Sequence, residues 1–314
     1  MAFTTNNVGD HLIRAELWSN QLKDILQDEL MASSYVRWLT EFPDGNTFTI
    51  PSVGEAQVNN IQENVPVEYS AMDTGEFNFS ISEYVGSAHY ITQKALQDAF
   101  YAQELMSMFV PKERRAIEEK LETDILALSA KQTLSNANVI NGANHRFVAS
   151  GTNEVMDVKD FALAKFALKK ANVPLSNLVA IVDPSVAYTL ETLTNLVNVS
   201  NNPQWEGIIT TGLTSGMRFI RNIFGFDVYE SNYLATANET IGSKTTAAGV
   251  ANMFFSAEAS VTPFIGAWRQ MPTVYSEFNK DLLREEYLTV ARYGLGLYRP
   301  ENLVVVLSDT DQVA

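Results

Sequence analysis

The chain has 314 residues, of which 46% are hydrophobic and 19% charged, a composition that excludes disordered, collagenous and disulfide-scaffold proteins. Its 22 Lys and Arg residues against 37 Asp and Glu residues give a net charge of −15, which excludes the electrostatic surface of a duplex-binding protein. The chain has no cysteine, so disulfides, thiolate nucleophiles and Cys-ligated zinc are excluded as well.

The N-terminal segment carries no targeting or membrane signal. It lacks the basic and apolar regions of a signal peptide, and no apolar run approaches the ~20 residues that a bilayer requires. We therefore expect a chain made in a cytoplasm, with no membrane segment. From Asp10 to Leu30, apolar residues recur at steps of three and four, which predicts an amphipathic helix.

Between Phe42 and Thr92 the sequence changes to runs of alternating polar and apolar residues, which predict a long β-hairpin extending from the body of the protein. From Trp38 to Gln93 there is no Lys or Arg. The hairpin is therefore either a solvated loop or an anionic surface that meets a cationic one on a neighbour. Its acidic residues are Glu41, Asp44, Glu55, Glu63, Glu68, Asp73, Glu76 and Glu83.

The segment from Gln93 to Lys131 consists of strong helix formers without glycine. It predicts one long helix of roughly 55 to 60 Å, bent or broken at Pro111. Asp124 falls on the apolar side of this helix, where a carboxylate needs a buried partner.

The remaining segments alternate between helices and strands. A helix at Val158–Ala171 is predicted to begin at the capping residue Asp157, and a strand follows at Leu178–Val182. Asp183 and Pro184 begin a helix that continues to about Leu196, and a loop is expected at 200–215. Together with strands at 226–230, 252–256, 286–293 and 303–307, these elements predict an α+β protein.

No pattern indicates catalysis, a metal site or a cofactor site. The histidines His11, His89 and His145 lie in separate segments, and no motif of nucleophilic or phosphate chemistry is present. Gly294 and Gly296 lie within a strand pattern, where they are expected to relieve packing or bend the sheet. The carboxylates of the long helix are expected on a solvated, salt-bridged face rather than in an acid pair. They are Glu118, Glu119, Glu122 and Asp124, beside Lys112, Arg114, Arg115 and Lys120.

The order of these elements is similar to that of the major capsid proteins of tailed bacteriophages with the HK97-type fold. The resemblance rests on the N-terminal helical arm, the hairpin around Gly45–Gly54 and the long helix with an Asp near its end. It continues through the strand that ends in Asp183-Pro184, the run Gly225–Asn232 (Gly-Phe-Asp-Val-Tyr-Glu-Ser-Asn), and Tyr293-Gly294 followed by Arg299-Pro300. Each motif is short, and the agreement lies in their order along nearly the whole chain.

The resemblance implies an N-terminal arm at 1–41 and an extended E-loop at 42–92. It also implies a P domain at 93–149 and 263–314 around the long helix, and an A domain at 150–262. It implies further that the chain is not an enzyme and needs no cofactor, and that copies assemble into hexamers and pentamers of an icosahedral head in the virion. This head would enclose double-stranded DNA without sequence-specific binding.

Several partners follow from the resemblance. Some relatives carry a scaffold-like domain of about a hundred residues before the arm, whereas only about forty residues precede the hairpin here. A separate scaffolding protein is therefore expected, with a portal protein and an optional decoration protein. The family's covalent cross-link needs a lysine on the E-loop, and this hairpin has none. An encapsulin-type compartment shell and an acidic α+β hydrolase remain as alternatives.

Charge suggests which residues of neighbouring subunits meet. The expected contacts join Glu55, Glu63, Glu68, Asp73 and Glu76 of the hairpin to Lys112, Arg114, Arg115 and Lys120 of the long helix, with Lys165, Lys169 and Lys170 as the alternative basic surface.

Overall fold

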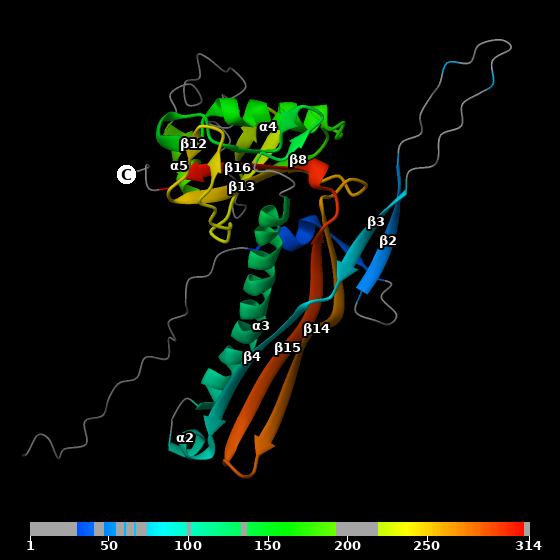
Figure 1. Ribbon diagram of the computed structural model, residues 1–314. Coiled ribbons are helices and arrows are strands. Elements are labelled where there is room, and N and C mark those ends of the chain that lie inside the picture. Colours follow the sequence, from blue (N-terminus) through cyan, green and yellow to red (C-terminus); the bar gives the residue numbers. More distant parts are fainter. Residues whose placement is uncertain are drawn as a thin grey trace, which may run out of the picture.

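The computed structural model describes residues 30–40, 47–54, 60, 66, 74–98, 102–132, 137–192 and 219–310. Its described part has three regions: an elongated body, a second body at one end of it, and a projecting two-stranded hairpin (Figure 1). The predicted helix at 10–30 and the predicted loop at 200–215 lie outside the described residues.

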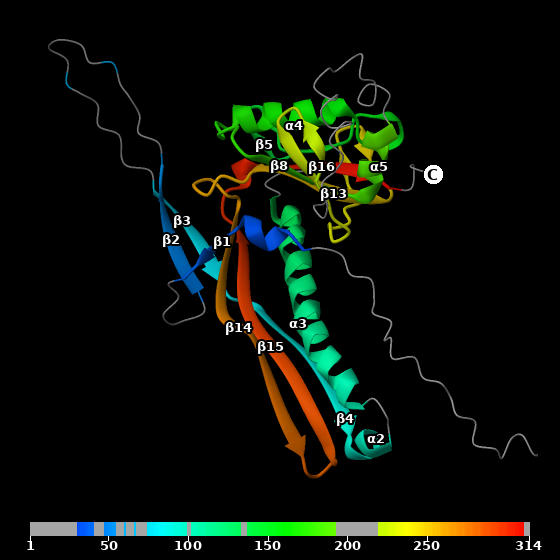
Figure 2. The same cartoon turned by 180° about the vertical axis from the view of Figure 1, so that it is seen from behind.

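The elongated body is a four-stranded sheet with a long helix along one face (Figures 1 and 2). The strand order is β1-β14-β15-β4, with β1 parallel to β14 and the other neighbours antiparallel. Its elements are η1 (Ala32–Tyr35), β1 (Val36–Leu39), β4 (Glu83–Thr92), α2 (Gln93–Asp98), α3 (Ala102–Leu126), η2 (Ala127–Gln132), β14 (Phe264–Asn279) and β15 (Arg284–Leu297).

The long helix differs from its prediction. The segment from Gln93 is divided between Asp98 and Ala102, and α3 continues through Pro111. With 25 residues, α3 is about 37 Å long, shorter than predicted. The proline costs one backbone hydrogen bond, and packing of α3 against β4, β15 and η1 offsets that loss.

The second body is a six-stranded sheet in the order β7-β16-β13-β8-β10-β9, between two layers of apolar side chains. Successive residues of β8 alternate between two cores: Leu178 and Ala180 pack toward α4 and α5, whereas Val179 and Ile181 pack toward the end of α3. The strand is therefore apolar throughout. The main elements are β7 (Arg146–Val148), α4 (Val158–Lys170), β8 (Leu178–Val182), α5 (Pro184–Thr192), β9 (Phe219–Ile223), β10 (Phe226–Glu230), β13 (Gly249–Ser256) and β16 (Leu303–Asp309).

Short elements connect these strands. They are β5 (Val139–Ile140), β6 (Ala143–Asn144), η3 (Thr152–Glu154), β11 (Thr240–Ile241), β12 (Lys244–Thr245) and η6 (Pro300–Asn302). The predicted cap of α4 is confirmed, because the Asp157 carboxylate accepts from the Val158 amide at 2.7 Å and Asp160 accepts from the Asp157 amide at 2.9 Å.

The projecting hairpin consists of β2 (Thr47–Val53) and β3 (Thr74–Ser80), paired antiparallel from Thr47 opposite Ser80 to Val53 opposite Thr74. It is shorter than the predicted hairpin at 42–92. The segment Glu83–Thr92 is β4, which pairs with β15 in the elongated body. The chain passes from the hairpin to the four-stranded sheet at Ile81. Phe79 and Ile81 are both buried, and their packing fixes the position of this transition.

Candidate assembly surfaces

The base of the hairpin is seated on β15 through two glycines. A Cβ atom at Gly294 would lie 2.5 Å from the Ser80 carbonyl oxygen, and one at Gly296 would lie 3.2 Å from the Phe77 ring. Any side chain at Gly294 would therefore push the hairpin off the sheet. The expectation that these glycines relieve packing is confirmed, and the close approach explains how the hairpin leaves the body at a fixed place.

Only one of the hairpin's predicted contact residues is described. Glu76 lies on β3 opposite Pro51, and its side chain is exposed. Glu55, Glu63, Glu68 and Asp73 lie outside the described residues.

Three of the predicted contact cations on α3 already have partners on the same helix. Arg114 donates to Glu118 at 3.0 Å, Arg115 donates to Glu119 at 3.2 Å, and Lys120 contacts Asp124. This arrangement confirms the expected salt-bridged face for three i,i+4 pairs. Any anionic partner has to compete with these carboxylates.

Glu122 does not lie on that face, and this corrects the prediction. Only 1% of the residue is exposed, and its carboxylate accepts from the Met31 amide at 3.1 Å and from the Ala32 amide at 2.8 Å. Burial raises the pKa of Glu122 above its ordinary value, with the backbone donors opposing that shift. Glu122 thus anchors the chain where it enters the elongated body.

Two further carboxylates of α3 accept hydrogen bonds from side chains of the four-stranded sheet. The Tyr293 hydroxyl donates to Asp124 at 2.7 Å, which supplies the buried partner that the sequence requires. Burial and this carboxylate raise the pKa of Tyr293 far above its usual range. Glu113 accepts from the Thr289 hydroxyl at 2.7 Å and lies 2.7 Å from Nδ1 of His89.

This Thr–Glu–His cluster cannot act as a catalytic triad. In such a triad the imidazole stands between the hydroxyl and the carboxylate, so that it can take the hydroxyl proton. Here the Glu113 carboxylate stands between Thr289 and His89. The cluster therefore joins α3 to β4 and β15 as a structural contact.

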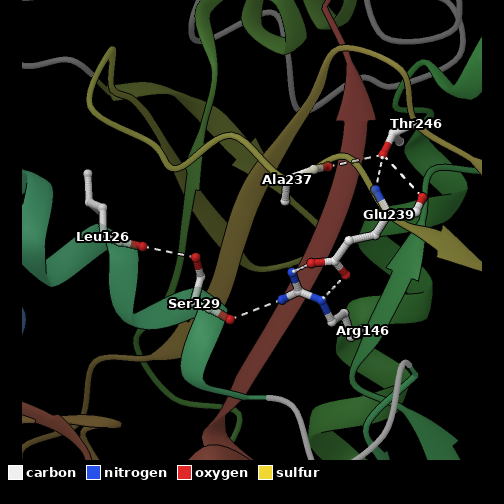
Figure 3. A network of polar contacts seen from close by, with 6 residues as sticks. All are labelled: Leu126, Ser129, Arg146, Ala237, Glu239 and Thr246. Atoms are coloured by element: carbon white, nitrogen blue, oxygen red, sulfur yellow. Dashed lines mark hydrogen bonds and ion pairs between the residues drawn. The ribbon is translucent and has the colours of Figure 1, made fainter.

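A buried arginine joins the two bodies (Figure 3). The Arg146 guanidinium donates to the two oxygens of Glu239 at 2.8 and 2.7 Å and to the Ser129 carbonyl at 3.0 Å. Ser129 lies in η2, directly after α3, where exposed carbonyl groups favour a cation. Arg146 begins β7 in the six-stranded sheet, so one side chain links this sheet to the end of α3. No sequence motif marks it.

The alternative basic surface lies on α4. Lys165 donates to the Phe224 carbonyl at 2.6 Å, and the Lys170 ammonium lies 5.9 Å from the centre of the Phe166 ring. No ion pair with a described carboxylate was found for Lys165, Lys169 or Lys170. These lysines therefore differ from Arg114, Arg115 and Lys120, which pair with carboxylates of their own helix.

Exposed apolar side chains gather on the distal half of the elongated body. Cross-strand neighbours place Tyr275, Leu288 and Ala88 side by side on the sheet face opposite α3. Exposed apolar side chains that lie side by side in this way are typical of a surface that another protein covers. Over both faces of the sheet and the β14–β15 turn, the large exposed apolar residues are Tyr84, Tyr90, Met271, Val274, Tyr275, Phe278, Leu282, Leu283 and Leu288.

Within the described segments there is no cluster of three or more His, Asp or Glu side chains that could hold a metal. In the same segments no helix has the length and apolarity needed to cross a membrane. His145 is buried, and burial lowers its pKa, which suits a neutral structural histidine. His11 lies outside the described residues.

Comparisons with solved structures establish the fold. The structure titled "Mycobacterium phage Che8" matches with a TM-score of 0.67 and 17% identity, over 94% of this chain and 97% of that chain. The capsid structure of cyanophage P-SCSP1u matches with a TM-score of 0.70 and 13% identity, over 95% and 93%. The capsid of cyanophage Pam1 matches with a TM-score of 0.66 and 13% identity, over 96% and 98%. The expected α+β capsid fold is confirmed.

Comparisons by sequence establish the family. No curated protein matches the chain. The model of a family described as phage capsid protein matches residues 76–306, which is most of the chain. These findings give no support to a compartment shell or a hydrolase. The chain belongs to the phage capsid protein family and is a structural subunit of a virion capsid, not an enzyme.

Proposed function

We propose that copies of this chain form hexamers and pentamers that close into an icosahedral head around double-stranded DNA. The observation that carries this proposal is the family match over residues 76–306, together with a hairpin that projects from the body. An isolated two-stranded ribbon is marginally stable in water, so the projecting part requires neighbours.

The proposed domains follow the capsid resemblance: arm 1–41, E-loop 42–92, P domain 93–149 with 263–314, and A domain 150–262. Within this division, β4 pairs with β15, so its residues contribute to the P-domain sheet. The part of the E-loop proposed to reach a neighbouring subunit is therefore centred on β2 and β3.

Contacts between subunits are proposed to join the anionic hairpin to a basic surface of a neighbour. The candidates remain Lys112, Arg114, Arg115 and Lys120 of α3, with Lys165, Lys169 and Lys170 of α4 as the alternative. Exposed ion pairs contribute only about 0 to 1 kcal/mol each, so their effect depends on repetition over many subunits.

The acidic chain suits a container for packaged DNA. A net charge of −15 disfavours the binding of DNA phosphates to the shell. Tight phosphate binding at every subunit would immobilise the genome while it is packaged and released. A separate scaffolding protein, a portal protein and, in some heads, a decoration protein are the proposed partners. Assembly would take place in the cytoplasm of a bacterial host.

Electron microscopy of the purified chain, expressed with and without its scaffold, tests the proposal. The expected result is closed shells of uniform size. Deletion of Val53–Asp73 should leave a folded subunit that forms no shells, because it removes the residues that join β2 to β3 and carry Glu55, Glu63, Glu68 and Asp73. Normal shells from the deletion variant would contradict the role of the hairpin, and a stable monomer under all conditions would contradict the function.

A further inference from the structure

A groove of about 670 Å³ lies between α3, the start of the chain's described part and β14. Its apolar lining includes Trp38, Ile117, Leu121, Trp268 and Met271. Trp38 and Trp268 stack with their ring centroids 5.2 Å apart, and Met271 is 68% exposed. The groove thus presents apolar surface without a described occupant.

The charged side chains that line the groove already have partners. Arg114 donates to Glu118 at 3.0 Å, Arg115 donates to Glu119 at 3.2 Å, and Glu122 accepts from the Met31 and Ala32 amides. The groove therefore suits an apolar segment.

We propose that residues 22–29 of the same chain occupy this groove as an amphipathic helix. Leu30 is the first residue after this segment and already lines the groove, so the arm must leave from its rim. This inference does not depend on the proposed head assembly, because it concerns a contact within one subunit.

The pattern of the arm fits the groove. Leu22, Ile25 and Leu26 fall on one face of a helix at i, i+3 and i+4. Eight helical residues extend about 12 Å, the same length as α3 from Arg114 to Glu122 along the groove. The apolar face then covers Trp268 and Met271.

Engineered cysteines test the contact cleanly, since the chain has none of its own. Met271→Cys is combined in turn with Leu22→Cys, Ile25→Cys and Leu26→Cys in the full, unassembled chain. At least one pair should form a disulfide under mild oxidation, because that bond requires Cα atoms within about 7 Å. The matched control replaces Met271→Cys by Tyr84→Cys, which is equally exposed but lies on the opposite sheet face.

Mixing isotope-labelled and unlabelled chains separates the possible occupants. Disulfides that join two peptides of the same label support the proposal. Mixed-label disulfides would mean that the arm of a second copy fills the groove, and no disulfide above the Tyr84→Cys control would mean that the arm does not dock. Either result overturns the proposal.

Fluorescence gives a second readout that needs no covalent bond. In a Trp18→Phe, Trp205→Phe background, only the groove tryptophans remain among the four in the chain. Leu26→Asp should shift their emission to longer wavelength, because it releases the arm and admits water. Gln27→Asp adds the same charge within the same segment, on the opposite helix face, and should leave the emission unchanged. Equal shifts in both variants would overturn the proposal.

Discussion

Arg146 and Glu239 form a two-point ion pair in which only one partner reaches solvent. The Arg146 side chain is 1% exposed and the Glu239 side chain is 36% exposed. Removing one residue or the other therefore leaves an unpaired charge in a different environment. A lone Glu239 can be hydrated, whereas a lone Arg146 remains a buried cation that contacts only the Ser129 carbonyl.

Glu239→Ala should accordingly destabilise the subunit more than Arg146→Met. We expect a loss of roughly 3 kcal/mol in the free energy of unfolding for Glu239→Ala, and about 1 kcal/mol for Arg146→Met. Urea denaturation of the unassembled subunit measures both values. Equal losses, or a larger loss for Arg146→Met, would show that the buried guanidinium is satisfied in another way.

The same pair predicts a pH effect. Hydrogen bonds from Arg146 lower the pKa of Glu239 below the ordinary 4.5. A lowered folded-state pKa stabilises the fold above pH 4.5, and this contribution disappears as the pH falls through the folded-state pKa. Glu239→Gln should therefore lose less stability than the wild type on acidification below pH 4.5, as measured by thermal unfolding at a series of pH values.

Glu122 should show the opposite sign. Burial raises its pKa above 4.5, so the folded state holds the proton more tightly than the unfolded chain does. This contribution is complete below pH 4.5 and is lost as the pH rises through the folded-state pKa. Glu122→Gln should flatten this part of the stability profile. Glu118→Gln, which removes a carboxylate from the outer side of the same helix, is the matched control, and an unchanged profile in Glu122→Gln would contradict the assignment.

The sequence predicted the local features well, since they depend on neighbouring residues. The Asp157 cap and the strand at Leu178–Val182 are both found where their patterns place them. The need of Asp124 for a buried partner was also correct, but the identity of that partner, Tyr293, depends on a contact 169 residues away.

The features that the sequence missed depend on the tertiary fold. β14 was not predicted because its distal half alternates little between apolar and polar residues, and both faces carry exposed apolar side chains. Arg146 is a lone arginine in an ordinary short strand, and its burial follows only from packing two bodies together. Glu122 was placed on the solvated face because its partners are backbone amides, which no side-chain pattern shows.

Gly294→Ala tests the contact between β15 and the base of the hairpin. The new Cβ would lie 2.5 Å from the Ser80 oxygen and 2.8 Å from the Ile81 Cα atom, and backbone atoms cannot move aside without displacing the hairpin. We expect a loss of about 1 to 3 kcal/mol and a reduced yield of shells. Gly86→Ala is the control, because its Cβ would meet its nearest atom at 3.4 Å on the same sheet face. Equal tolerance of both variants, by denaturation and electron microscopy, would contradict this role of Gly294.

The mature shell should contain no covalent links between subunits and should weaken with salt. The segment from Trp38 to Gln93 has no lysine to form an isopeptide bond, and the chain has no cysteine for a disulfide. Denatured particles are therefore expected to give a single band at the monomer mass, and a ladder of oligomers would contradict this expectation.

The shell should also weaken as salt is added. Salt weakens the attraction between exposed charges, with a screening length of about 10 Å at 0.1 M that shortens as the salt concentration rises. Contacts between the anionic hairpin and a basic neighbour should therefore lose strength as ionic strength rises. Light scattering during a salt titration measures the loss of shells. Shells that resist salt would rule out charge matching at the hairpin and leave apolar burial on β4, β14 and β15 as the main source of cohesion.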